Sequence, residues 1–566
     1  LEDLSALGEF ETAYATAELE ANGPTVTYTL FKMMNALSDG MMIAIILFVS
    51  ALVVAIAFIC IRFTLLSKME DDYHEIGVMK AIGLRIADIK RIYFVKYVAL
   101  ATVGSILGFG LSLLFKDILL ENIRIYMGEA ENSSFAPLFG IIGILVVLFS
   151  ILLYVNGVLK HLKKISVVEA IRFGTSQEKS SNSKRFYLNS NRLLNTNIFL
   201  GIKDVLKRKK LYATMLAILV VSSFIIIVPQ NLYNTISSKN FTQYMGIGNY
   251  DMRIDIQQTQ NISEKTEDIL TGMRNDHTIS TYAALTTKIF KAKMEDGTEE
   301  NLKIELGDHS AFPIVYSQGK APVKENEIAL SSINADEMSK KVGDVITLVI
   351  KGKEQDFSVS GIYSDITNGG KTAKAVFADD SAQIMWSIII AELSDTSIVS
   401  SKVTEYSNKF GYAKVSDVDD FVTQTFGSTI RSVETASYAA IVVSLIITAL
   451  ITLLFMKMLI AKDRTSIAIM KALGFTKSDI KLQYISRSVF VLIIGIMLGT
   501  LLANTLGETI AGAIISSFGA DSFKFTVNPL SAYLLCPLMM ICAVLIATLG
   551  GTSGAGKISI SQNIKG

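Results

Sequence analysis

The sequence predicts an α-helical membrane protein made of two repeated membrane modules, with a mixed α+β domain outside the membrane. Three observations lead to this fold class. The 566 residues are 50% hydrophobic and only 19% charged, and their mean hydropathy of +0.43 is too high for a soluble protein of this length. A sixteen-residue stretch occurs twice in the chain. Basic residues are also segregated from acidic ones along the sequence.

The repeated stretch reads EIGVMKAIGLRIADIK at residues 75–90 and SIAIMKALGFTKSDIK at residues 466–481. Eight of the sixteen positions are identical without a gap, and equivalent residues differ by 391 in number. The same register continues to Tyr93 and Tyr484. Because an internal repeat marks a duplicated structural unit, we expect two membrane modules of similar design.

Seven uncharged apolar stretches are long enough to cross a bilayer. They are residues 41–61, 97–115, 136–159, 211–230, 436–456, 488–507 and 529–550. None has a charged residue at its centre, which argues against an ion or proton relay through the membrane.

The charge distribution orients these spans. Residues 160–210 carry thirteen Lys or Arg against three acidic residues, so the positive-inside rule places them in the cytoplasm. The same rule places both copies of the repeat inside. It leaves residues 116–131 and the long, acidic segment 239–434 outside.

Residues 1–39 are expected outside the membrane, because they precede a span that leads into the cytoplasm. In the second half, the span at 211–230 precedes the long external segment, and the first half shows no equivalent span in this sequence. We therefore expect the intact protein to have eight spans and a first external domain that ends at residue 39.

The expected organisation has six parts. They are the end of a first extracytoplasmic domain (1–39), a first three-helix membrane module (40–173), a cytoplasmic linker (174–196), an amphipathic helix with a span (197–231), an extracytoplasmic α+β domain (232–435) and a second three-helix module (436–566).

Local patterns in the external segment predict paired strands at 344–350 and 357–362 around a Lys-Gly-Lys turn, preceded by a helix at 333–341.

Each copy of the repeat is expected to form a helix, a glycine turn and a second helix that enters the membrane. Gly83 and Gly474 fall within the apolar pattern, where a glycine inside a helix costs about 1 kcal/mol relative to alanine. A helix end is the simpler interpretation. Thr476 and Asp479 then have the spacing of a capping box for the next helix.

Two glycine pairs recur at equivalent positions of the following spans. They are Gly104 with Gly108 and Gly495 with Gly499. Glycines four residues apart allow close contact between helices in a bilayer, so we expect these pairs to be packing sites.

The sequence EIGVMKAIG, followed by a short turn, Asp88-Ile89, an aromatic residue and a glycine-rich span, resembles the FtsX/MacB-type permease module of ATP-binding-cassette (ABC) systems. The resemblance covers both halves, including KKISVVEAIR at 163–172 and GKISISQNIK at 556–565 after each last span. It implies two FtsX-like permease modules without an ATPase of their own. Separate cytoplasmic ABC ATPase subunits, two per chain, would bind ATP and drive the short helices.

The residues carried over as ATPase contacts are Glu75, Met79, Lys80, Gly83, Asp88, Met470, Lys471, Gly474 and Asp479. The acidic residue Glu75 has Ser466 as its equivalent, so an acidic contact is expected on one side only.

The resemblance implies export, extraction or detoxification of amphiphilic substrates such as antimicrobial peptides or lipids. Two alternatives stay open: a peptide-sensing complex that signals to a sensor kinase, and a regulator of an extracellular cell-wall hydrolase that transports nothing. An enzyme is not expected, since no nucleophile, metal or acid–base constellation is present, and neither a cofactor nor a nucleic-acid partner is expected. We expect a multi-pass protein in contact with membrane lipid, and the composition favours a Gram-positive plasma membrane.

Overall fold

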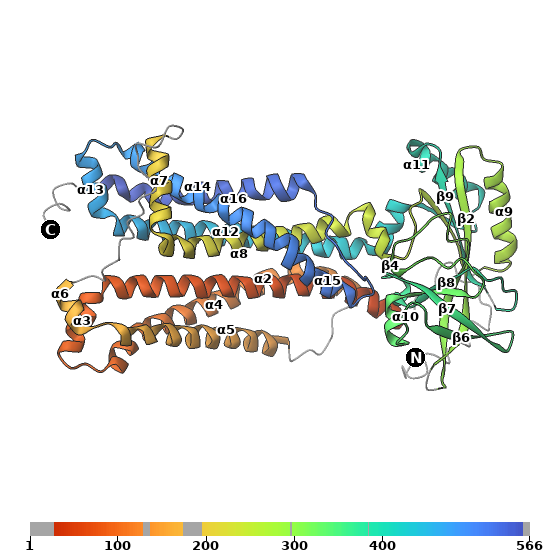
Figure 1. Ribbon diagram of the computed structural model, residues 1–566, viewed down its shortest axis with the longest axis horizontal. Coiled ribbons are helices and arrows are strands. Elements are labelled where there is room, and N and C mark those ends of the chain that lie inside the picture. Colours follow the sequence, from red (N-terminus) through yellow and green to blue (C-terminus); the bar gives the residue numbers. More distant parts are fainter. Residues whose placement is uncertain are drawn as a thin grey trace. The chain divides into compact units, whose positions relative to one another are not determined.

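The computed structural model describes residues 28–127, 136–173, 195–257, 259–294, 297–382 and 384–558 (Figure 1). The chain forms two compact units. The first, which we call the sheet unit, is built mainly from Asn234–Arg431 and Glu508–Thr526. The second, the membrane unit, contains Met42–Tyr233, Ser432–Gly507 and Val527–Gly566. Residues 508–526, which we expected in the second membrane module, thus cluster with the sheet. The predictions for residues 1–27 and 174–194 lie outside the described residues.

Seven helices are long and apolar enough to cross a membrane within the described residues, which confirms the seven predicted spans. They are Asp39–Asp71, Ile86–Phe115, Leu138–Lys163, Lys209–Ile236, Val418–Lys462, Lys477–Ser516 and Ser531–Gly556.

The helices of the first half follow the predicted order. They are α2 (Tyr28–Asp71), α3 (Tyr73–Ala81), α4 (Ile86–Met127), α5 (Ala136–Val158), a 3-10 turn (Leu159–Lys164) and α6 (Val167–Phe173).

The second half repeats this series after two additional helices, α7 (Thr196–Lys207) and α8 (Lys209–Ile236). Its other helices are α12 (Val418–Lys462), α13 (Arg464–Ala472), α14 (Lys477–Leu502), α15 (Glu508–Ser516), α16 (Cys536–Thr552) and a 3-10 turn (Ser553–Lys557). Two π-helical turns, Ala503–Gly507 and Ser531–Leu535, flank α15 and the loop that follows it.

The glycine turn predicted in each repeat is present. Gly83 and Gly474 both have φ +93°, a left-handed conformation that other residues rarely adopt, and each lies two residues after the last residue of a nine-residue helix. The capping box of α14 is also confirmed, with the Thr476 side chain accepting from the Asp479 amide and the Asp479 side chain accepting from the Thr476 amide. The duplicated sequence therefore folds into duplicated local structure.

The two halves of the membrane unit meet along α2 and α12. The rings of Phe63 and Phe455 stack with centroids 5.3 Å apart. Nearer the repeat, Lys462 Nζ lies 2.7 Å from a carboxylate oxygen of Glu70. These contacts place an apolar pair and an ion pair between equivalent helices of the two halves.

The two glycine pairs differ in their surroundings. A Cβ atom at Gly495 would lie 2.9 Å from Leu219 Cβ, and one at Gly499 would lie 2.6 Å from Ser223 Cβ, so α14 is in close contact with α8 there. At Gly104 and Gly108 such an atom would have no neighbour within 4 Å among the described residues. Among the described residues no helix takes the place of α8 beside these two glycines, so the packing expected at Gly104 and Gly108 stays a prediction.

The sheet unit has one ten-stranded, mixed sheet. Its strands are β1 (Met252–Gln257), β2 (Ile279–Lys293), β3 (Glu299–Gly307), β4 (Tyr316–Gly319), β5 (Glu327–Ser331), β6 (Val345–Ile350), β7 (Lys353–Tyr363), β8 (Thr372–Ala375), β9 (Ile384–Leu393) and β10 (Lys414–Asp417). The order is β10-β1-β9-β2-β3-β8-β5-β7-β4, and β6 pairs with β2 and β7. The predicted hairpin is β6–β7, with Lys351 and Gly352 at its turn.

Three helices accompany the sheet: α9 (Ile262–Arg274), α10 (Ser332–Glu337) and α11 (Val399–Lys409). The predicted helix at 333–341 is thus α10, although it ends at Glu337. Ile254, Ile269 and Ile389, from β1, α9 and β9, are fully buried in one apolar cluster. The unit therefore has a core of its own, as the absence of cysteine from it requires.

A loop that follows α15 is bonded to the sheet. The carbonyl oxygen of Gly519 accepts hydrogen bonds from the amide of Asp365 at 3.1 Å and from Ser332 Oγ at 2.9 Å. The Ser364 hydroxyl and the backbone of Asp521 also bond to each other in both directions. The segment between α14 and α16 is consequently part of the sheet unit.

The Asp365 carboxyl makes the stability of the sheet unit dependent on pH. Burial raises its pKa from 3.8 to about 6, against hydrogen bonds from Thr367 and Thr372 that lower it. Because the folded state holds this proton more tightly than the unfolded chain, stability is expected to fall by up to about 3 kcal/mol as pH rises from about 4 to about 6. Fluorescence of the single tryptophan, Trp386 in β9, reports the unfolding. Asp365→Asn should flatten the change, and an unaltered pH profile in that variant would contradict the assignment.

Candidate coupling site

The short helices α3 and α13, which we call the coupling helices, are fixed in place by a lysine each. Lys80 Nζ donates to the carbonyl oxygens of Leu162 and Ile165, both at 2.7 Å. Lys471 Nζ donates to Gly556 and Ile558 at 3.1 and 2.8 Å. Each pair of carbonyls lies at the end of the last span of its half, with one carbonyl inside the span and one two residues beyond it.

Burial lowers the pKa of Lys80. Through these hydrogen bonds, Lys80 and Lys471 each attach a coupling helix to the end of the last span of the same half.

Apolar packing holds the same inner face of each coupling helix, one turn before the lysine. Ile76 and its equivalent Ile467 are fully buried. In the first half α3 lies beside α6, and a Cβ atom at Gly77 would come within 2.5 Å of Ala170 Cβ (Figure 1). The coupling helices are therefore packed closely against the helices around them.

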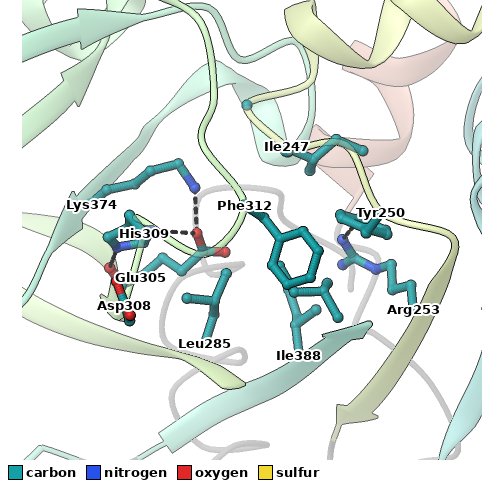
Figure 2. A pocket seen from close by; sticks show the side chains of 13 residues that line it. Ile247, Tyr250, Arg253, Leu285, Glu305, Asp308, His309, Phe312, Lys374 and Ile388 are labelled. Atoms are coloured by element: carbon teal, nitrogen blue, oxygen red, sulfur yellow. Dashed lines mark hydrogen bonds and ion pairs between the residues drawn. The ribbon is translucent and has the colours of Figure 1, made fainter. Parts of the chain in front are cut away.

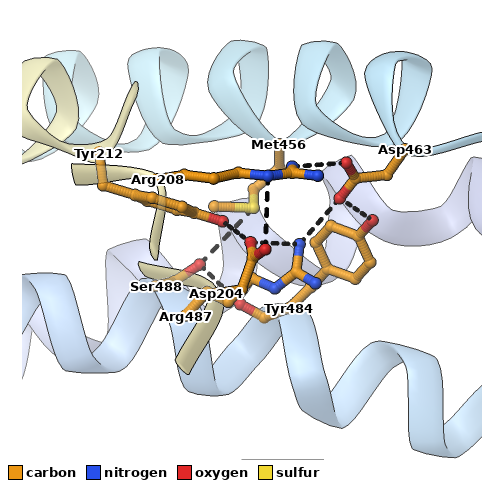
Figure 3. Close-up of polar contacts among 8 residues, drawn as sticks. All are labelled: Asp204, Arg208, Tyr212, Met456, Asp463, Tyr484, Arg487 and Ser488. Carbon is orange, nitrogen blue, oxygen red and sulfur yellow. Dashed lines mark hydrogen bonds and ion pairs between the residues drawn. The ribbon is translucent and has the colours of Figure 1, made fainter. Parts of the chain in front are cut away.

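A buried polar cluster, which we call the Asp463 cluster, lies at the start of α13 (Figure 3). Asp463 accepts hydrogen bonds from Arg208 Nη1 at 2.7 Å, from Arg487 Nη1 at 2.9 Å and from the Tyr484 hydroxyl at 2.9 Å. Asp204 completes the cluster, with carboxylate oxygens 3.4 Å from Arg208 Nε and 3.2 Å from Arg487 Nη1.

Burial opposes ionisation of Asp463, but the hydrogen bond and charge of Arg208 and the charge of Arg487 lower the pKa of its carboxyl. One carboxylate therefore joins the ends of α7 and α12 to α14.

The first half has only part of this arrangement. Tyr93 donates to Asp72 at 2.8 Å, in the same way that Tyr484 donates to Asp463. The other carboxylate oxygen of Asp72 is bound by Lys68, one turn earlier on the same chain segment, at 2.6 Å. The two coupling helices are thus held alike by their lysines but unequally at their first turns.

The outward surface of each coupling helix carries a matched apolar pair. Ile82 and Leu473 are equivalent in the repeat and are both 72% exposed. One turn earlier, Val78 and Ile469 are 40% and 48% exposed. Two exposed apolar residues at i and i+4 form one ridge, and the same ridge occurs on both helices. We take this ridge as the candidate contact surface for a partner protein.

The predicted contact residues divide into two groups. Glu75 and Asp88 are exposed. Met79 and Met470 pack against the apolar clusters of their halves, the two lysines bind backbone carbonyls, Gly83 and Gly474 form the turns, and Asp479 caps α14. Most of these residues hold the coupling helices in place, and the exposed ridges were not singled out from the sequence. The signal available for them was that both repeats have apolar residues at these equivalent positions, in segments predicted to be cytoplasmic.

Charge differs at the first turns of the coupling helices. Exposed Glu75 in α3 is replaced by Ser466 in α13, where the preceding Arg464 is exposed instead. The two ridges are thus alike in apolar character and unlike in charge.

A hollow in the sheet unit is lined by charged side chains (Figure 2). Lys374 in β8 forms an ion pair with Glu305 in β3, and Arg253 binds Asp255, two residues along β1, at 2.8 Å. The first pair joins two strands and the second lies within one strand. Because these charges already have partners, we assign no ligand to the hollow. No group of metal-binding side chains occurs in the part of the chain that the structure describes.

Comparison with known proteins identifies the membrane modules. The family model described as FtsX-like permease C-terminal matches twice, at residues 47–166 and 438–560. No curated protein matches the sequence.

Among solved structures, the periplasmic region of MacB from Actinobacillus actinomycetemcomitans is similar, with 13% identity, a TM-score of 0.25 and coverage of 34% of this chain and 97% of that one. The extracellular domain of the noncanonic ABC-type transporter YknZ from Gram-positive bacteria has 10% identity, a TM-score of 0.21 and coverage of 30% and 100%.

The fold and the coupling helices define a multi-pass membrane protein with a duplicated three-helix module and a sheet-rich domain. The matched modules place the chain in the FtsX-like permease family, as an ABC transporter permease subunit. Permeases of this family work with a cytoplasmic ABC ATPase and are generally non-catalytic subunits.

Proposed function

We propose that this permease converts ATP hydrolysis by two cytoplasmic ATPase subunits into movement of its sheet unit, one subunit docking on each coupling helix. The observation that supports it best is the matched pair of coupling helices, each anchored through its lysine and each presenting the same apolar ridge. A groove in one ATPase subunit would cover Val78 and Ile82, and the same groove in the second ATPase subunit would cover Ile469 and Leu473.

The chain provides a continuous route for this movement. Strand β10 is followed directly by α12, which leads to the coupling helix α13, and α14 starts three residues after the glycine turn. The segment after α14 is in turn bonded to the sheet through Gly519. A displacement of α13 therefore acts on the sheet unit through two chain segments, α12 and α14. This arrangement suits a mechanical link better than a polar transport path.

The substrate class that fits this proposal is amphiphilic, such as an antimicrobial peptide or a lipid, expelled or extracted at the outer membrane surface. The segment 239–434 is acidic, which favours cationic peptides. The composition supports a Gram-positive plasma membrane as the location.

The test is purification of the full-length protein from its native membrane in mild detergent, with quantification of the subunits that accompany it. We expect an ABC ATPase at two copies per permease, and ATPase activity that rises when an amphiphilic peptide is added. A permease that purifies without an ATPase would overturn the proposal. Stimulated ATP hydrolysis without loss of peptide from the membrane would favour signalling over transport.

A further inference from the structure

A cluster of lysines surrounds the junction between α7 and α8. Residues 203–210 contain five cations and one acidic residue. The acidic residue, Asp204, and one cation, Arg208, belong to the Asp463 cluster. The four lysines that remain are Lys203, Lys207, Lys209 and Lys210, and the last three of them are exposed. None of the four forms an ion pair with another residue in the part of the chain that the structure describes. Their charges are therefore available to an anionic partner.

Helix α7 crosses α14 and buries one face against it (Figure 1). Asn197, Gly201 and Val205 form the buried face, and a Cβ atom at Gly201 would lie 2.7 Å from the carbonyl oxygen of Gln483 in α14. The other apolar residues of α7 are only partly buried by the protein: Ile198, Phe199, Ile202 and Leu206. An amphipathic helix at the cytoplasmic end of the spans places such residues at the boundary between headgroups and acyl chains.

Two contacts connect α7 with the surroundings of the coupling helix α13. Asn197 Nδ2 donates to Asp479 at 2.7 Å, and Asp479 caps α14 directly beyond the glycine turn that follows α13. At the other end of α7, Asp204 lies 3.2 Å from Arg487, which also binds Asp463 at 2.9 Å. Asp463 is the residue before the first residue of α13. Helix α7 is thus linked to the chain on both sides of this coupling helix.

The first half lacks these links within the described residues. Asp88, the equivalent of Asp479, is exposed, and the partners of Asp72, the equivalent of Asp463, are Lys68 and Tyr93. A ligand that binds α7 therefore acts on α13 and has no corresponding contact with α3.

We propose that the four lysines bind the headgroups of anionic phospholipids in the inner leaflet, and that this binding holds α13 in place but not α3. A phospholipid matches both kinds of side chain on α7, since its phosphate suits the lysines and its acyl chains suit the partly buried apolar residues. Clusters of four or more cations on an amphipathic helix beside a span attract anionic lipids, and each cation contributes about fivefold in affinity. The lipid composition would thereby determine how firmly one of the two coupling helices is held.

Titration of the full-length protein in detergent with phosphatidylglycerol, followed by native mass spectrometry, tests the binding site. The test variant replaces the three exposed lysines: Lys207→Gln, Lys209→Gln and Lys210→Gln. Its affinity for the lipid is expected to fall by roughly a hundredfold, because three contributions of about fivefold are lost.

The matched control replaces three exposed lysines at the cytoplasmic ends of α4 and α5: Lys96→Gln, Lys160→Gln and Lys163→Gln. It removes the same charge from the same side of the membrane and should leave the tightest lipid binding unchanged. Equal losses in the test and control variants would show that any lysine beside a span attracts the lipid, and would overturn the proposed site.

Hydrogen–deuterium exchange in nanodiscs tests the effect on the coupling helix without depending on an ATPase. Replacing phosphatidylcholine with phosphatidylglycerol is expected to slow amide exchange in α13 by roughly tenfold and to leave α3, the internal control, unchanged. Asn197→Ala retains all four lysines, so it should keep the lipid affinity but reduce this slowing, because its bond to Asp479 is lost. Equal slowing in α3 and α13, or slowing in neither, would overturn the proposal.

Discussion

Replacing Ile82 and Leu473 with aspartate is expected to uncouple the permease from its ATPase subunits. Burying an isoleucine or leucine side chain contributes about 1.5–3 kcal/mol, so each substitution should weaken binding of one ATPase by roughly tenfold to a hundredfold. Both side chains are 72% exposed in the permease, which means that the fold of the permease itself should be unaffected. The measurement is the affinity of the purified ATPase for permease reconstituted in lipid nanodiscs, with each single variant and the double variant.

Ala87→Asp and Ser478→Asp are the matched controls for this experiment. The two residues are exposed and equivalent, at the start of α4 and α14, where a carboxylate is compatible with a helix N-terminus. They add the same charge as the test variants without removing an apolar ridge. Equal losses of affinity in test and control variants would show that added negative charge, and not the ridges, is responsible. Unchanged affinity in the double variant would mean that the ATPase does not dock on these ridges.

The fold class and the spans could be predicted because their signals are local. Uncharged apolar stretches need only length to be recognised, and the glycine turns at Gly83 and Gly474 are indicated by one residue in a helical pattern. The β6–β7 hairpin likewise depends on neighbouring residues. By contrast, the order of ten strands depends on pairings such as β3 with β8, in which Lys303 lies opposite Thr372, and local patterns do not specify such partners.

The helix and glycine turn of each repeat could be predicted, but the contacts of their lysines could not. Lys80 and Lys471 were expected to contact an ATPase subunit, because the family resemblance carried them over as part of that contact. Their actual acceptors are the carbonyls of Leu162 and Gly556, among others, more than eighty residues along the chain. Similarly, Asp463 and Arg208 are far apart in sequence, and only the folded chain brings them together. Their side chains could be recognised as a pair only from the tertiary structure.

Removing the Asp463 carboxylate is expected to destabilise the membrane unit far more than removing its equivalent, Asp72. Asp463→Ala leaves the buried guanidinium group of Arg487 and the partly exposed one of Arg208 with Asp204 as their remaining carboxylate, and breaking a buried ion pair typically costs about 3–5 kcal/mol. Asp72→Ala removes the ion pair with half-exposed Lys68 and the hydrogen bond from Tyr93, and we expect this to lower stability by about 1–2 kcal/mol. Denaturant titration in detergent measures both values.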